Sequence, residues 1–138
     1  MIDRTVLTAA EAAFVASRRV AHLATVLPDG TPHVVPICTV LDMDRLVFAS
    51  ERDTQKIRNI GDDPRVAIAF DEYAEAWREL RQVIVFGRAY FVEGGPEFVR
   101  DRQLLYDAFE QYPTEAPIEE DSSVVVEVRL DRATSLGF

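Results

Sequence analysis

The sequence predicts a mainly β fold, in which six antiparallel strands curl into a small barrel with helices at its flanks. Two observations lead to this prediction. Six stretches rich in β-branched and aliphatic residues are separated by turn signals that contain Gly, Pro or Asp. These stretches do not alternate with helical segments as parallel βαβ folds require, so antiparallel pairing is expected. Closing such a sheet into a barrel removes its exposed edges.

The first half of the chain predicts one helix and three strands. Thr8 and Glu11 have the spacing of a capping box, and an alanine-rich helix is expected from there to about Ser17. Turns that contain Gly, Pro or Asp separate the β-branched runs that follow. The three strands are expected at residues 20–27, 33–41 and 46–50.

A short helix is expected between the third and fourth strands. Asp53 or Thr54 is expected to cap its start, and Gly61 is expected to end it. This segment carries most of the functional signal in the sequence.

Three cations lie at or just after the start of this short helix, namely Arg52, Lys56 and Arg58. Unpaired backbone N–H groups and the helix dipole favour an anion there, so a ligand with a phosphate group is predicted. At about 100° per residue, Lys56 lies at the edge of the apolar helix face and Arg58 points further toward solvent. Lys56 is therefore predicted to be the main phosphate contact. The alternative is that all three are solvated charges offsetting nearby carboxylates.

The second half of the chain predicts three more strands and a longer helix. Gly87 lies inside a long apolar run and would permit a β-bulge. Between Glu97 and about Tyr112, apolar residues recur at helical spacing. The strands are expected at residues 65–73, 82–92 and 123–130.

Composition narrows the class of protein. The 138 residues fit one domain. With 24 Asp and Glu against 15 Lys and Arg, the formal net charge of -9 disfavours a nucleic-acid or anionic-membrane surface. A single cysteine, Cys38, excludes an internal disulfide and favours a reducing, cytoplasmic setting. No signal-peptide pattern or apolar run of about 20 residues is found, so secretion and membrane insertion are disfavoured.

The sequence contains no common catalytic or metal-binding motif. His22 is expected in the barrel core, and Cys38 is expected to be a buried apolar residue rather than a nucleophile. No catalytic residue and no metal ligand are assigned. An anion site without proton-transfer machinery fits a redox cofactor, for which the protein supplies binding and orientation.

Six short motifs occur in an order and spacing typical of one family. They are Ala24–Thr25, Asp29–Pro36, Val47–Ser50, Gln55–Ile60, Asp63–Val66 and Arg81–Arg88. Through these motifs the chain resembles the pyridoxamine 5′-phosphate oxidase-like flavin-binding split barrels, and it is also similar to their deazaflavin-dependent relatives. The resemblance covers about Ala21 to Gly137. It implies that residues 1–138 form a single split-barrel flavin-binding domain.

The resemblance also implies a cofactor and a partner. Members of the family are homodimers with a flavin in each of two clefts at the subunit interface, where a small-molecule substrate meets the ring. By position, Lys56 matches the residue that holds the cofactor phosphate, Gln82 matches a glutamine that touches the flavin, and the backbone of residues 35–37 borders the ring. The implied cofactor-binding residues are Val35, Pro36, Ile37, Ser50, Thr54, Gln55, Lys56, Arg58 and Gln82.

Departures from the family pattern limit which of the family's reactions are expected for this chain. The strand at residues 35–40 contributes no basic residue, and Leu136 stands where true pyridoxamine phosphate oxidases have a tryptophan, so oxidation of pyridoxamine phosphate itself is not expected. The run Gln55–Asn59 is closer to the deazaflavin branch, whereas Arg81–Val83 is closer to the FMN branch. The resulting hypothesis is an FMN-binding oxidoreductase that transfers hydride between the flavin and an unknown small substrate. The alternatives are a reductase that uses the 8-hydroxy-5-deazaflavin coenzyme, and a non-enzymatic flavin or haem binding or storage protein.

Overall fold

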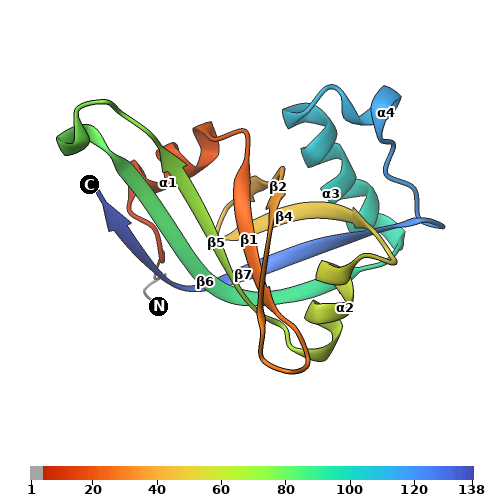
Figure 1. Ribbon diagram of the computed structural model, residues 1–138. Helices are drawn as coiled ribbons and strands as arrows, with labels where there is room; N and C mark the ends of the chain where they lie inside the picture. Colours follow the sequence, from red (N-terminus) through yellow and green to blue (C-terminus); the bar gives the residue numbers. More distant parts are fainter. Residues whose placement is uncertain (1–4) are drawn as a thin grey trace, which may run out of the picture.

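The computed structural model describes residues 5–138, and its centre is one antiparallel sheet of seven strands in the order β2-β1-β5-β6-β7-β4-β3. The strands are β1 Ala21–Val26, β2 Pro32–Ile37, β3 Val40–Asp42, β4 Arg45–Glu51, β5 Arg65–Glu72, β6 Arg81–Val92 and β7 Ser123–Leu136. Figure 1 shows this sheet strongly curled, with helices around it. The predicted mainly β, antiparallel fold with flanking helices is confirmed.

The predicted number of six strands is wrong, because the expected strand at residues 33–41 is two strands. It is interrupted at Cys38 and Thr39, where the chain passes from β2 to β3. β2 pairs with β1 and β3 pairs with β4, at opposite edges of the sheet. The Thr39 hydroxyl donates to the carbonyl oxygen of Val47 over 2.9 Å and fixes this corner. The two edge strands, β2 and β3, therefore meet at this corner but do not pair with each other. The barrel is split along the line between them.

Helices cover the ends and one side of the curled sheet. The predicted capping box is confirmed, since the Glu11 N–H donates to the Thr8 hydroxyl and the Thr8 N–H donates to the Glu11 carboxylate. No helix within residues 5–138 is long and apolar enough to cross a membrane. The helices are α1 Ala9–Ser17, α2 Gln55–Asp62, α3 Gly95–Ala108 and α4 Tyr112–Glu115, with a 3₁₀ turn, η1, at Trp77–Glu79.

The core has two parts that share β4 and β7. Inside the barrel, Phe48 and Val126 are fully buried with the other inward-facing strand residues. On the opposite face of the same two strands, Val47 and Val125 are buried beneath Phe98 of α3. Both strands are thus buried on two faces, which explains why their sequences are nearly continuous apolar runs rather than alternating ones.

Two local predictions, one on β6 and one on β1, had different outcomes. The bulge expected at Gly87 is confirmed, because the β6–β7 register shifts between Phe86 and Gly87. A Cβ atom at Gly87 would lie 2.1 Å from the carbonyl oxygen of Arg129, so only glycine fits. The expectation that His22 lies in the core is wrong. Alternation along β1 turns this side chain outward, where it is 49% exposed and lies 3.9 Å from Asp71.

Candidate functional site

The start of α2 combines free backbone donors with a pair of hydroxyl groups. Thr54 occupies the N-cap position, but its side chain makes no capping hydrogen bond. Its hydroxyl lies 3.0 Å from the Ser50 hydroxyl and 3.4 Å from the carbonyl oxygen of Glu51. The first-turn N–H groups are therefore not taken by this cap and are available to an acceptor from outside the helix.

Two of the three cations at this helix already have protein partners. Arg52 donates to the Glu93 carboxylate over 2.8 Å and to the Glu120 carbonyl oxygen over 2.6 Å. These bonds tie the end of β4 to the segments that follow β6 and precede β7. Arg58 pairs with Asp53 over 2.8 Å, and both side chains are largely exposed. Arg52 is thus a structural residue and Arg58 a surface ion pair.

Lys56 is the cation that remains free. Its side chain is partly buried in the first turn of α2, and burial lowers the pKa of its ammonium group, although the nearby charge of Glu51 partly opposes this shift. Within residues 5–138 the ammonium makes no hydrogen bond and no ion pair. A partly buried, unpaired cation is costly unless a ligand pairs with it, and a phosphate group would do so.

A buried amide fixes α2 against the sheet. Asn59 has no exposed surface, and its Nδ2 donates to the Thr25 hydroxyl of β1 over 3.0 Å. Its Oδ1 accepts from the Gln55 side-chain amide over 2.7 Å, while Oε1 of Gln55 accepts from Arg58. Opposite Thr25 in the ladder lies His33, whose buried Nδ1 has no partner among residues 5–138. Sequence reasoning missed Asn59, whose only signal is a polar residue on the apolar face of the helix.

Beyond His33, the strand β2 presents its backbone rather than polar side chains. Val35 and Ile37 point toward the barrel interior and Pro36 points outward. Because β2 is an edge strand, the backbone groups on its side away from β1 have no neighbouring strand. These groups are available to a ligand at the split of the barrel.

Gln82 lies far from the start of α2. It is exposed on the outer face of β6, opposite Asp71 of β5. Asn59 bonds α2 to Thr25 of β1, whose neighbour Ala24 pairs with Ala67 of β5. Along β5, the distance from Ala67 to Asp71 is about 13 Å. Figure 1 shows α2 and the β5–β6 connection at opposite ends of the sheet. One copy of the chain therefore does not bring Gln82 and Lys56 together.

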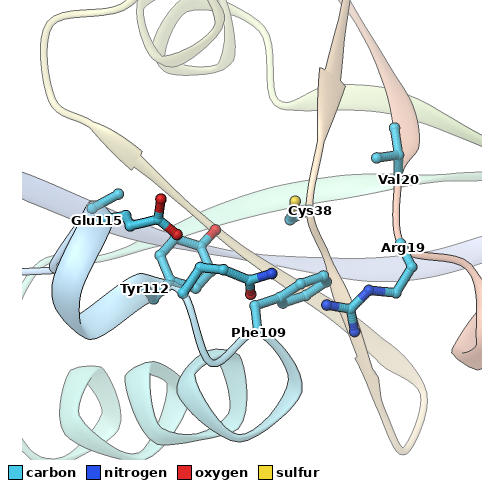
Figure 2. A pocket seen from close by; sticks show the side chains of 8 residues that line it. Arg19, Val20, Cys38, Phe109, Tyr112 and Glu115 are labelled. Atoms are coloured by element: carbon cyan, nitrogen blue, oxygen red, sulfur yellow. The ribbon is translucent and has the colours of Figure 1, made fainter.

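Two hollows lie beside α4. The first has a volume of about 340 Å³ and lies between Tyr112 and the residue that follows β2, Cys38. In Figure 2 the side chains of Phe109, Tyr112 and Glu115 approach it from the helical side. The second has a volume of about 380 Å³, shares Tyr112 and Glu115 with the first, and extends to Ser50. The second hollow thus reaches the hydroxyl pair at the start of α2.

A separate charged cluster lies where α3 meets β4 and β7. Asp101 is fully buried, and Arg45 contacts Asp42, Asp101 and Glu127. Burial, reinforced by the adjacent Glu127, raises the pKa of Asp101 to about 6. The pKa of Glu127 is lowered by its hydrogen bonds to Asp101 and Arg45. Among the described residues, no group of three or more His, Cys, Asp and Glu side chains is arranged to hold a metal ion.

The sequence pattern of the family described as pyridoxamine 5′-phosphate oxidase matches residues 7–136, nearly the whole chain. The chain belongs to the pyridoxamine 5′-phosphate oxidase family. The family resemblance inferred from the short motifs is therefore confirmed, and with it the split-barrel fold. A search of curated protein sequences finds no match.

Solved structures of this family are similar over most of the chain. A conserved hypothetical protein from Mycobacterium tuberculosis is 27% identical with a TM-score of 0.80, and the match covers 95% of this chain and 85% of that one. An F420 reductase is 28% identical with a TM-score of 0.71, and the match covers 88% and 94%. A haem binding protein from Mycobacterium smegmatis is 24% identical with a TM-score of 0.79, covering 99% and 56%, which supports the shared fold alone.

Proposed function

We propose that this protein is an oxidoreductase that binds FMN and acts on a small-molecule substrate. The observation that carries the proposal is the free, partly buried Lys56 ammonium at a helix start whose N–H groups are uncapped. The family supports the same assignment, because flavin-type cofactors bring a phosphate group to such a site. When bound, the flavin supplies the hydride chemistry, and the chain supplies binding and orientation.

The residues at the start of α2 fit the phosphate end of this cofactor. Lys56 neutralises its charge, and the first-turn N–H groups donate to its oxygens. The hydroxyls of Ser50 and Thr54, which bond to each other and to the Glu51 carbonyl oxygen, rotate to donate to the phosphate when it binds. Gln55 and Arg58 border this group, although each is already hydrogen-bonded within the helix. The free backbone edge of residues 35–37 borders the flavin ring.

We infer that the functional unit is a homodimer. On the outer face of the sheet, Val34, Ala24, Ala67 and Phe86 lie side by side across β2, β1, β5 and β6. Val34 is 65% exposed although it is apolar. This apolar strip, partly covered at Phe86 by the Arg132 guanidinium 3.8 Å above its ring, suits a second copy of the chain. Gln82 lies on the same face, so it would contact the cofactor held by the Lys56 of the other copy.

A deazaflavin-dependent reductase is the second candidate function. The 28% identity to an F420 reductase over 88% of the chain favours it. The α2 site does not separate the two cofactors by charge, because both carry a phosphate group. A haem or flavin storage protein is the non-enzymatic alternative.

A ligand series on the purified protein tests these proposals. Its absorption spectrum is recorded first, and then the shift in melting temperature is measured with FMN, riboflavin, the 8-hydroxy-5-deazaflavin coenzyme and haemin. FMN is expected to raise the melting temperature more than riboflavin, which has the same ring without the phosphate. Equal shifts in melting temperature with FMN and riboflavin would contradict the proposed phosphate site. Stabilisation by haemin alone would favour the haem storage alternative.

A further inference from the structure

The first hollow beside α4 is a mainly apolar cavity of about 340 Å³. Its walls include Val20 before β1, Cys38 after β2, and the aromatic rings of Phe109 and Tyr112. Cavities of this size and lining accommodate small organic ligands of one or two rings. No part of the proposed phosphate site lies in it, so it is available for a second ligand.

The charged side chains at this cavity do not favour an anion. Arg19 donates to the carbonyl oxygen of Ala108 over 2.9 Å, and its guanidinium lies 4.5 Å from the centre of the Phe109 ring. These contacts fix the guanidinium at the wall of the cavity, where it keeps its positive charge. Glu115 adds a negative charge on the opposite side. A neutral ligand fits this combination of charges better than an acidic one.

Tyr112 provides a hydrogen-bond donor in this apolar setting. Its ring stacks on Tyr106 at 6.2 Å, and Phe109 packs edge-on at 6.0 Å, so its position is fixed by packing. The hydroxyl of Tyr106 accepts from the N–H of Ile118 over 3.0 Å. The hydroxyl of Tyr112 has no hydrogen-bond partner within residues 5–138, and burial raises its pKa to about 12. It therefore stays protonated and free to donate at neutral pH.

The cavity adjoins the place proposed for the flavin. Cys38 directly follows Ile37, which belongs to the segment proposed to border the ring. On its other side, Tyr112 also lines the second hollow, which extends to Ser50 at the start of α2. The first hollow therefore lies between the segment proposed to border the ring and the second hollow, which leads to the proposed phosphate site.

We propose that the first hollow is the substrate subsite, that it takes a neutral, flat quinone or enone of one or two rings, and that the Tyr112 hydroxyl donates a hydrogen bond to the carbonyl oxygen of this ligand. The proposal deepens the proposed function and rests on it for the role of the ligand as substrate. The binding step itself needs only the residues of this cavity.

The test measures equilibrium binding of 2,3-dimethyl-1,4-naphthoquinone, whose methyl groups block addition of the Cys38 thiol, to the purified protein by calorimetry, with 2,3-dimethylnaphthalene and naphthalene-2-sulfonate as comparison ligands. The neutral quinone is expected to bind more tightly than either the hydrocarbon, which lacks the acceptor, or the sulfonate, which carries a negative charge. Tyr112→Phe is expected to weaken binding of the neutral quinone about 3- to 10-fold, the effect of one hydrogen bond, and to leave binding of the hydrocarbon unchanged.

Tyr106→Phe is the matched control, because it removes a hydroxyl that is already used by the protein. It is expected to leave quinone binding unchanged. Val20→Phe adds bulk from an exposed position on the wall and is expected to weaken both neutral ligands even where Tyr112→Phe does not fold.

Three results would overturn this inference: no quinone binding, equal binding of the sulfonate, or a Tyr112→Phe variant that binds the quinone as the wild type does. If FMN binds and the quinone does not, the subsite is wrong while the proposed function stands. If the quinone binds and FMN does not, the proposed function fails and the cavity remains a site for neutral carbonyl compounds.

Discussion

Replacing Lys56 with alanine is expected to weaken FMN binding without harming the fold. A charge-assisted hydrogen bond to phosphate contributes about 1.5–3 kcal/mol, which corresponds to a rise of about 10- to 150-fold in Kd. A value near the upper end of this range is expected because the ammonium is partly buried, so water screens it less than a surface charge.

The fold is expected to survive this change because Lys56 has no partner to lose in the unliganded protein. Burial already lowers its pKa, which means that the folded state disfavours the charged form. The melting temperature of unliganded Lys56→Ala should therefore equal or slightly exceed that of the wild type. FMN should stabilise the variant less than it stabilises the wild type.

The assay is quenching of FMN fluorescence at constant ionic strength. Arg58→Ala is the matched control, because Arg58 lies in the same helix but pairs with Asp53 at the surface. Its effect on Kd is expected to stay within about threefold, as for other exposed ion pairs. A Lys56→Ala variant that binds FMN as tightly as the wild type would place the phosphate elsewhere, and a larger effect of Arg58→Ala would reverse the roles assigned to the two cations.

Three further predictions concern stability. Asn59→Ala should lower the free energy of unfolding in urea by about 1–3 kcal/mol, because the change leaves the buried hydroxyl of Thr25 without its donor. Gly87→Ala should cost about 1–3 kcal/mol or more, because the new methyl group would overlap the carbonyl oxygen of Arg129; full stability would contradict the bulge geometry. The pKa of Asp101 is raised from 3.8 to about 6 in the folded state, so its contribution to stability is present at low pH and is lost as the pH rises from about 4 through 6. Urea unfolding between pH 4 and 7 should show this part of the pH dependence in the wild type and not in Asp101→Asn.

Much of the sheet was predictable because its signals are local. Strand β5 and the Gly87 bulge follow from short apolar runs and from one glycine inside such a run. The break between β2 and β3 was not predictable, because no glycine or proline marks Cys38 or Thr39. The chain changes partners there only because the two edges of the sheet must meet, which is a property of the whole barrel.

The candidate site was predictable to the extent that helix phase determines it. The position of Lys56 at the edge of the apolar helix face followed from spacing alone. The engagement of Arg52 did not, because its partners lie 41 and 68 residues further along the chain. The hollow beside Tyr112 was missed for the same reason, since Cys38 and Tyr112 come together only in the folded barrel.

From the corner at Cys38 and Thr39, β2 and β3 run along the split of the barrel, and no backbone ladder joins them across this line. Separating β2 from β3 breaks no backbone ladder, because each of them pairs only on its other side. Opening anywhere between β5 and β6 would break a ladder of eight paired residues. Amide protons on the free edge of β2 should therefore exchange with solvent faster than those of β5. The cavity beside Tyr112 lies at the Cys38 end of this line.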